Sequence, residues 1–232
     1  MMKVSLLIDY EKLMTIESKK KMKTTLKDED DNKVSLMNAA FLMKYIFENI
    51  LEWTPYMIRD YFTPEIAKWL HIDYCVAKIP FPPELDHNND YFFVAHYLYP
   101  DILPYNKKKA VLEVYNRERN KKSPKFPRKF FQDKAGKDNL DICLKYIISE
   151  NFYAMDNKAI YDYFSDIKRA KRFIDDCSLA TPVKNHYSSV LNAIHSVLPE
   201  GDKDETYYHL IVLNNCLEKK KIHCEVKTLE DS

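Results

Sequence analysis

Ile58-Arg59-Asp60-Tyr61-Phe62 returns 102 residues later as Ile160-Tyr161-Asp162-Tyr163-Phe164. Upstream, Met43-Lys44-Tyr45-Ile46 matches Leu144-Lys145-Tyr146-Ile147 at an offset of 101. Further matches keep the same order: Asp73 and Cys75 with Asp175 and Cys177 at 102, then His96 and Pro100 with His195 and Pro199 at 99. Apolar periodicity produces chance pairs between amphipathic helices, but it does not predict shared Lys, Asp, Cys, His and Pro in one order. We therefore interpret the chain as two diverged copies of one unit.

Short helices are predicted in each copy. Thr54-Pro55 and Thr63-Pro64 each place a capping residue before a proline at the first helical position, which predicts helices at 55–62 and 64–72. Asp156 and Ser165 take the corresponding capping places in the second copy. Apolar spacing predicts the other helices, at residues 38–52, 89–99, 107–119, 185–198 and 205–220.

We expect an all-α protein with at most short peripheral strands, in which two small multi-helix units pack in tandem through matched apolar faces. The N-terminal extension holds a strand or an added helix at 1–17 and a polar loop at 19–32. The expected division is 1–37 for this extension, 38–120 for the first unit, 121–137 for a basic linker, 138–221 for the second unit and 222–232 for a tail with one short strand.

Glycine usage narrows the function classes. The 232 residues include two glycines, Gly136 and Gly201, where average usage would give roughly sixteen. Phosphate-binding loops and dinucleotide folds need several glycines for positive φ and close backbone approach. The sequence therefore excludes both kinds of nucleotide site, while its 46% hydrophobic content is enough for a sizeable core.

The net charge of +1 gives no whole-chain argument for nucleic acid, but one segment is strongly basic. Residues 107–137 hold twelve basic and three acidic side chains, with Tyr115, Phe126, Phe130 and Phe131 interleaved. Cations neutralise phosphates, and aromatic rings stack on unpaired bases. The alternative is a solvated junction whose Phe side chains anchor it to the core and whose charges attract the acidic remainder of the chain. The candidate nucleic-acid contacts are Arg117, Arg119, Lys121, Lys122, Lys125, Arg128 and Lys129.

The two short helices at 55–62 and 64–72 also resemble a helix-turn-helix in outline, although small bundles contain such corners routinely. This outline adds a weak argument for a DNA partner.

The spacing of the candidate ligands and catalytic residues offers little support for a metal site or an active site. His209, Cys216 and His223 recur every seven residues, and His71 and Cys75 are four apart, which places them on one face of a helix. Zinc sites usually show closer ligand pairs, and buried thiols and ordinary helix histidines are far commoner. The matched His96 and His195 have no nucleophile or acid partner at a telling spacing. We expect no metal, no cofactor and no catalytic residue, and hence a non-enzymatic protein. A third alternative, an enzyme of some other chemistry, would need a deep pocket with convergent ionisable side chains.

Cellular placement follows from three absences in the sequence. No apolar run approaches the roughly 18 to 20 residues that span a bilayer, and the N-terminus lacks a signal peptide's apolar core and cleavage site. The five cysteines are an odd number and fit no closed disulfide framework. We expect a cytoplasmic protein with free thiols and no membrane partner.

Three segments carry a family resemblance. The helix followed by Trp53-Thr54-Pro55, the stretch Ala95–Asp101 and the run Phe126–Phe131 are similar to an uncharacterised helical domain family found mostly in low-GC Gram-positive bacteria. The similarity covers about residues 38–200, and the second copy departs where Met155 replaces Trp53. The resemblance implies a helical fold and carries no activity.

The functional expectation is a regulatory or accessory protein that binds DNA or RNA through the basic linker. The alternative is a protein–protein interaction adaptor of mobile-element or phage origin, which would expose an aromatic patch.

Overall fold

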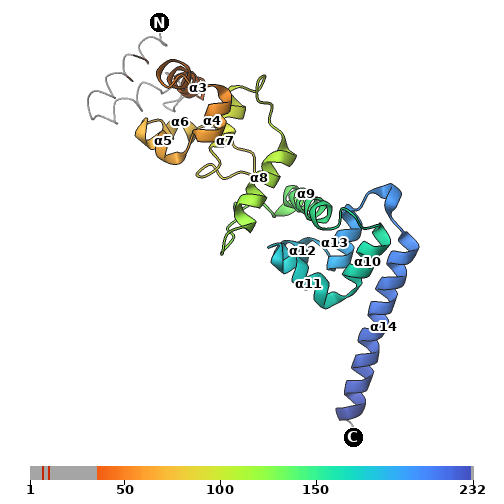
Figure 1. The fold of residues 1–232 in the computed structure, drawn as a ribbon. Helices are drawn as coiled ribbons and strands as arrows, with labels where there is room; N and C mark the ends of the chain where they lie inside the picture. Colours follow the sequence, from red (N-terminus) through yellow and green to blue (C-terminus); the bar gives the residue numbers. More distant parts are fainter. Residues whose placement is uncertain (1–6, 8–9, 11–35, 231–232) are drawn as a thin grey trace. The chain divides into compact units, whose positions relative to one another are not determined.

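A computed structural model of the chain describes Leu7, Tyr10 and residues 36–230, except for the side chains of residues 202 and 218–230 (Figure 1). The expected polar loop at 19–32 and most of the segment 1–17 lie outside these residues, although Leu7 and Tyr10 are helical. The described residues form twelve α-helices and no strand, which confirms the all-α prediction.

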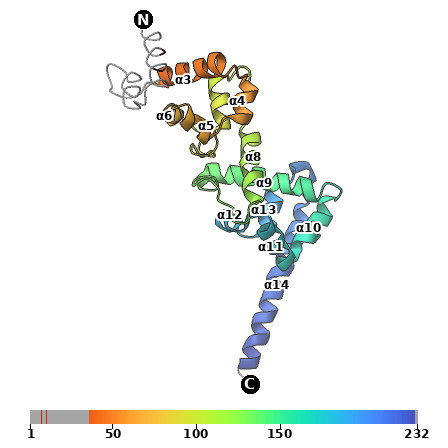
Figure 2. The same cartoon turned by 60° about the vertical axis from the view of Figure 1, so that its left-hand side comes forward.

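The chain divides into two compact units between Lys107 and Lys108. The first unit contains α3 (Leu36–Tyr45), the π-helix η1 (Ile46–Ile50), α4 (Pro55–Tyr61), α5 (Pro64–Trp69), α6 (Asp73–Val76) and α7 (Phe92–Leu98). The second contains α8 (Lys107–Arg119) from its second residue on, and then α9 (Asp133–Asn151), α10 (Asn157–Ser165), α11 (Ile167–Asp176), α12 (Ala180–His186), α13 (Val190–Val197), η2 (Glu200–Asp202) and α14 (Glu205–Glu230). Figure 2 shows the same helices from a second direction.

The division differs from the one expected. We placed the end of the first unit at residue 120 and a linker at 121–137, whereas α8 and the segment after it lie within the second unit. The expected strand in the tail is wrong, because α14 continues through residue 230. The sequence prediction ended α14 at residue 220.

Most of the predicted capping residues are found at the starts of the short helices. The Thr54 hydroxyl accepts a hydrogen bond from the Met57 N–H at 3.3 Å, and the Thr63 hydroxyl accepts one from the Ile66 N–H at 3.4 Å. In the second unit, Asp156 accepts from the Ala159 N–H at 2.8 Å. The prediction for Ser165 is wrong, because Ser165 is the last residue of α10 and Asp166 caps α11.

Each unit buries its own apolar core. In the first, α4 packs on α7, and Ile58 and Val94 are fully buried. In the second, α10 packs on α11, α13 and α14, and its Tyr161 and Phe164 are buried among them. Burying one such apolar side chain contributes roughly 1.5–3 kcal/mol. The cores therefore fix the positions of the short helices, which would be marginal in isolation.

One turn recurs in both units. After α5, the His71 N–H donates to the Lys68 carbonyl and the Ile72 N–H to the Ala67 carbonyl, with His71 at φ 56°. After α11, the Ser178 and Leu179 N–H groups make the same two bonds, to Asp175 and Ile174, with Ser178 at φ 59°. This is the pattern of a Schellman helix end.

A buried tyrosine closes each of these helix ends. The Tyr10 hydroxyl donates to the Leu70 carbonyl at 3.1 Å, and the Tyr115 hydroxyl of α8 donates to the Cys177 carbonyl at 2.8 Å. Leu70 and Cys177 are the C-cap residues of α5 and α11. The two units thus share a helix end and the hydroxyl that satisfies it.

This geometry changes two pairs in the sequence alignment, Asp73 with Asp175 and Cys75 with Cys177. The shared helix end aligns Leu70 with Cys177 at an offset of 107, whereas the sequence match paired Cys75 with Cys177 at 102. Cys75 lies beyond the turn, in α6. The offset grows because α11 has ten residues where α5 has six.

Candidate nucleic-acid interface

The site is built on the segment between α8 and α9, residues 120–132. Its backbone is held close against the first turn of α9. A Cβ on Gly136 would stand 2.2 Å from the Phe131 carbonyl carbon, so only glycine fits this crossing. The Asn139 side-chain amide donates to the Phe130 carbonyl at 2.9 Å, and Phe130 is fully buried. Phe130 therefore anchors the segment to the core, as expected for a solvated junction between the units.

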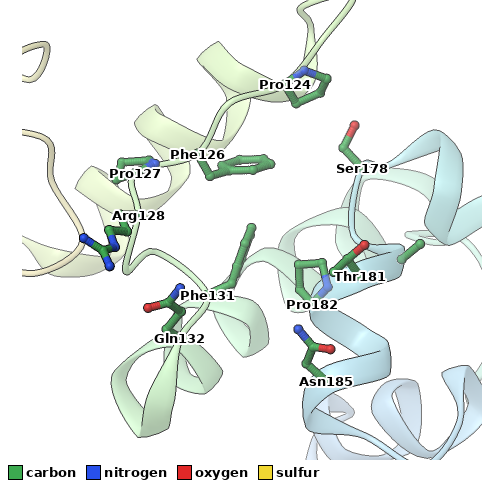
Figure 3. A pocket seen from close by; sticks show the side chains of 11 residues that line it. Pro124, Phe126, Pro127, Arg128, Phe131, Gln132, Ser178, Thr181, Pro182 and Asn185 are labelled. Carbon is green, nitrogen blue, oxygen red and sulfur yellow. The ribbon is translucent and has the colours of Figure 1, made fainter.

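The other two phenylalanines line an open hollow of about 540 Å³. Figure 3 shows Phe126 and Phe131 pointing from the segment toward α12, whose Thr181, Pro182 and Asn185 form the opposite wall. The two rings meet edge to face, with centroids 4.9 Å apart. A hydrogen bond of 2.7 Å joins His186 Nε2 of α12 to the Phe131 carbonyl and ties the two walls together.

A second hollow adjoins the first. It has a volume of about 350 Å³ and shares Ala180 and Thr181 with the first. Lys171 of α11 and Lys184 of α12 lie in its wall, beside Tyr187. Cationic side chains therefore continue from the 120–132 segment across α12 to α11.

Glu118 already occupies two of the seven predicted contacts. Its buried carboxylate accepts from Lys121 Nζ at 2.6 Å and from Arg117 Nε at 3.1 Å, and the Lys125 N–H donates to it at 3.2 Å. Burial alone would raise the pKa of Glu118, but these hydrogen bonds outweigh it and hold the pKa below its usual value. Arg117 and Lys121 thus serve an internal carboxylate, which sequence reasoning missed.

Arg119 is likewise held inside the second unit. Its guanidinium lies 5.2 Å from the ring centroids of both Tyr115 and Tyr146 and donates to Glu150 at 3.0 Å. Cation–π contact on two rings and an ion pair favour the charged form, and hydrogen bonds to Glu150 and Tyr115 raise the pKa of Arg119 against the effect of burial. This arginine stabilises the packing of α8 on α9.

The other four predicted contacts are exposed. Lys122, Lys125, Arg128 and Lys129 point to solvent and have no carboxylate within 4 Å among the described residues. Arg128 lies at the edge of the first hollow (Figure 3). The structure thus separates the predicted set into three engaged and four available cations.

Sequence reasoning missed the cationic surface of α11. Lys168, Arg169, Lys171 and Arg172 are all exposed on the N-terminal half of this helix, and two aspartates, Asp175 and Asp176, end it. This order opposes the helix dipole, which favours acids at the N-terminus and bases at the C-terminus by about 0.3–1 kcal/mol each. The pattern Lys-Arg-x-Lys-Arg was visible in the sequence and could have marked this surface.

One polar cluster looks reactive but is not activated. Lys137 Nζ lies 2.9 Å from Asp141 and 2.8 Å from the Tyr187 hydroxyl, which accepts from Ser196 at 2.9 Å and itself donates to Asp141. The hydrogen bond to Tyr187, and then the one to Asp141, raise the pKa of Lys137, and burial raises the pKa of Tyr187. At neutral pH the lysine therefore stays charged and the tyrosine stays protonated, so neither is poised as a base or nucleophile.

The histidines of the matched pair have different partners. His96 Nδ1 lies 3.0 Å from the Leu103 carbonyl. His195 Nδ1 lies 2.7 Å from the Tyr161 hydroxyl, and its Nε2 lies 3.2 Å from Glu205. Their equal spacing in the sequence does not give them equal chemistry.

The structure does not bring the candidate metal ligands together. His71 and Cys75 do not share a helix face, since the turn between α5 and α6 separates them. His223 of the second spacing lies outside the described side chains, and no group of three candidate ligands occurs among the residues that the structure describes.

Comparisons with known proteins give one match. Residues 111–203 match a family described as a protein of unknown function, DUF4046, which agrees with the resemblance to an uncharacterised family. The match begins within α8 and ends before α14, so it covers most of the second unit. No curated protein and no solved structure matches the chain. In the part of the chain described, no helix combines the length and apolar character needed to cross a bilayer.

Proposed function

We propose that the second unit binds single-stranded nucleic acid through a surface that we call the basic band. The band consists of the four cations of the 120–132 segment that have no carboxylate partner among the described residues, together with those beside the second hollow: Lys122, Lys125, Arg128, Lys129, Lys171 and Lys184. The observation that carries the proposal is the first hollow, where Phe126 and Phe131 are presented beside Arg128. Duplex bases are stacked on one another, so rings in such a hollow suit unpaired bases.

The charge of α11 supports the same function. A helix whose cations oppose its own dipole gives up stability, and binding of a phosphate backbone would offset that cost. Lys171 connects this helix to the second hollow, which places α11 beside the basic band. The chemistry required is electrostatic attraction with stacking, and it needs no catalytic group.

Fluorescence anisotropy tests the proposal. The full chain is titrated with a labelled single-stranded DNA, a single-stranded RNA of the same sequence and a duplex, at several salt concentrations. We expect the single strands to bind more tightly than the duplex, with affinity falling steeply as salt rises. Binding that is absent at low salt, or equal for all three, contradicts the proposal.

Charge-matched variants separate the band from general attraction. Replacing Lys122, Lys125, Arg128 and Lys129 with Gln should lower single-strand affinity and reduce the log–log salt slope by about 0.7 per lost phosphate contact. The control replaces four exposed lysines elsewhere: Lys68, Lys78, Lys145 and Lys158. An equal loss in the control would show that net charge, rather than the band, is responsible. Phe131→Ala should weaken single-strand binding without changing the salt slope.

A protein-interaction role is the second candidate, and the first unit favours it. Tyr56, Tyr61 and Trp69 of α4 and α5 are 58–67% exposed, which is unusual for large aromatic side chains. A nuclease-treated pull-down with the full chain, compared with Tyr61→Ser and Trp69→Ser variants, tests this role. A partner that both variants retain would exclude this surface.

We also infer that the two units arose by duplication. The helix ends after α5 and α11 and the tyrosines that close them support this inference beside the matched sequences. We further propose that the protein has a regulatory role, lies in the cytoplasm and comes from a low-GC Gram-positive bacterium.

A further inference from the structure

We propose that the second hollow binds a terminal phosphate of the strand whose base stacks in the first hollow. The inference rests on the proposed function and adds a substrate class to it, namely single strands that end in a phosphate monoester. The two hollows share Ala180 and Thr181 at the start of α12. A base in the first hollow and a phosphate in the second would therefore lie on the two sides of these residues.

The walls of the second hollow carry two positive charges and no negative one. Lys171 comes from α11 and Lys184 from α12, and none of the ten residues that line the hollow is acidic. Neither lysine has a carboxylate within 4 Å among the described residues. Two cations in the wall of one hollow, without an anion to balance them, favour a ligand that carries two negative charges.

Hydroxyl groups in the same wall supply further hydrogen bonds for an anion. Thr181 and Ser188 are exposed, and their hydroxyls have no partner among the residues that the structure describes. The Ser189 hydroxyl accepts a hydrogen bond from the Asn192 N–H at 3.0 Å, which leaves its own proton available. Three hydroxyls can therefore donate to phosphate oxygens, as serine and threonine side chains commonly do.

The carboxylate bonded to this wall from behind is already neutralised. The Tyr187 hydroxyl donates to Asp141, and Lys137 Nζ lies 2.9 Å from the same carboxylate. Lys137 also donates to the Tyr187 hydroxyl at 2.8 Å. Because Lys137 and Asp141 form an ion pair, together they add no net charge to the hollow.

The charge of the hollow favours the end of a strand over its middle. A phosphodiester within a strand carries one negative charge, whereas a phosphate monoester carries about 1.5 to 2 at pH 7. A terminal phosphate also has the strand on one side only. It can enter a hollow of about 350 Å³ that a continuing strand would have to both enter and leave.

Fluorescence anisotropy with strands that differ only at their ends tests the inference. The full chain is titrated with one internally labelled single-stranded DNA of about 12 nucleotides, within the usual site sizes. The strand ends in a 5′-phosphate, in a 3′-phosphate or in hydroxyls at both ends. We expect a phosphate at one of the two ends to raise the affinity about tenfold, since one charge-assisted contact contributes that much. The end that responds gives the direction of the bound strand.

The outcomes distinguish this inference from the proposed function. Equal affinities for the three strands overturn the inference and leave single-strand binding intact, whereas no binding of any strand contradicts both. A strand with a methyl ester on its terminal phosphate separates charge from size, because the ester carries one negative charge. It should lose most of the gain. If it binds as tightly as the free monoester, the hollow does not select strand ends.

Matched variants assign the gain to the second hollow. Lys171→Gln combined with Lys184→Gln should remove the difference between phosphate-ended and hydroxyl-ended strands. Lys122→Gln combined with Lys129→Gln removes two lysines of the basic band outside the second hollow and should weaken both strands equally. Ser188→Ala is a milder change that should reduce the gain and covers the case in which the lysine variant fails to fold. A gain that survives in the Lys171 and Lys184 variant, or that disappears in the control, overturns the inference.

Discussion

Single residues decide where the candidate interface lies. Gly136 lets the first turn of α9 pass against the Phe131 backbone, and Phe130 fixes the same segment in the core. The sequence showed two glycines but gave no reason to prefer one, because a close approach depends on which backbone crosses it. The structure distinguishes them, since a Cβ on Gly201 would meet nothing within 4 Å.

Gly136→Ala should therefore destabilise the second unit, by about 1–3 kcal/mol if the segment shifts to make room. Gly201→Ala is the matched control and should change stability by less than about 0.5 kcal/mol. Urea unfolding followed by circular dichroism measures both. Equal midpoints for the two variants would show that the crossing at Phe131 is not tight.

The basic residues show how far sequence can predict at this scale. Counting charges located the segment 107–137, but it treated all seven proposed contacts as equivalent. Glu118 lies one residue from Arg117 and three from Lys121, so the sequence could have indicated these two ion pairs, whereas only folding brings Glu150 to Arg119. Ion pairs between distant residues depend on tertiary structure and leave no local pattern.

The helices that begin with a cap were the most predictable elements. Threonine followed by proline predicts a helix start from local chemistry alone, and α4 and α5 begin at the predicted residues. The Asp156 prediction was also confirmed, but at the next turn the cap moved by one residue, from Ser165 to Asp166. Serine and aspartate both cap helices, so adjacent candidates could not be ranked without the backbone.

Thr54 and Asp156 cap α4 and α10, which the proposed duplication makes equivalent helices, so their side chains should be interchangeable. We expect Thr54→Asp and Asp156→Thr to change the free energy of unfolding by a few tenths of a kcal/mol. Thr54→Ala and Asp156→Ala should each cost about 1 kcal/mol, since the Met57 or Ala159 N–H loses its acceptor. Thermal unfolding of the four variants distinguishes the cases. Exchanges as costly as the alanine variants would argue against equivalent helices.

Element ends without such signals were less predictable. The tail was expected to hold a strand, whereas α14 runs through it to Glu230. The apolar pattern near residue 222 fits either element over a few residues, and short windows do not separate the two periods. Extending the pattern of residues 205–220 across the boundary would have favoured the helix.

The whole molecule should lose stability in alkali because many of its tyrosines are buried or bonded to carboxylates. Burial raises the pKa of Tyr10 and of Tyr161 to about 12, and it raises those of Tyr99 and Tyr115 further still. In the unfolded chain these hydroxyls titrate near 10. Their stabilisation is therefore complete below pH 10 and is lost as the pH rises toward 12.

We expect the urea midpoint to begin falling at about pH 8.5, because burial also raises the pKa of the Cys75 and Cys143 thiols, and to fall more steeply above pH 10 as the tyrosines contribute. Tyrosinate absorbance at 295 nm should show an early class of exposed groups and a late class that ionises together with unfolding. A urea midpoint that stays constant up to pH 11.5 would mean that these hydroxyls ionise in the folded protein at the same pH as in the unfolded chain.

At this scale the sequence predicted an all-α chain of two parts, while it misplaced the boundary between them. The sequence prediction placed α8 at the end of the first unit, which it took to be residues 38–120. Its Tyr115 hydroxyl and its stacked Arg119 instead join it to residues of α9 and α11. Which neighbour a helix packs on is a long-range property that periodicity does not record.

The bond from Tyr115 to Cys177 spans 62 residues, and this distance matters while the protein is being made. A ribosome adds about 5–20 residues per second, so roughly 3–12 s separate the synthesis of the donor from that of its acceptor. During that interval the Tyr115 hydroxyl lacks the acceptor that it has in the folded protein, because Cys177 has not yet been made. A chaperone at the exit of the ribosomal tunnel could bind α8 during those seconds.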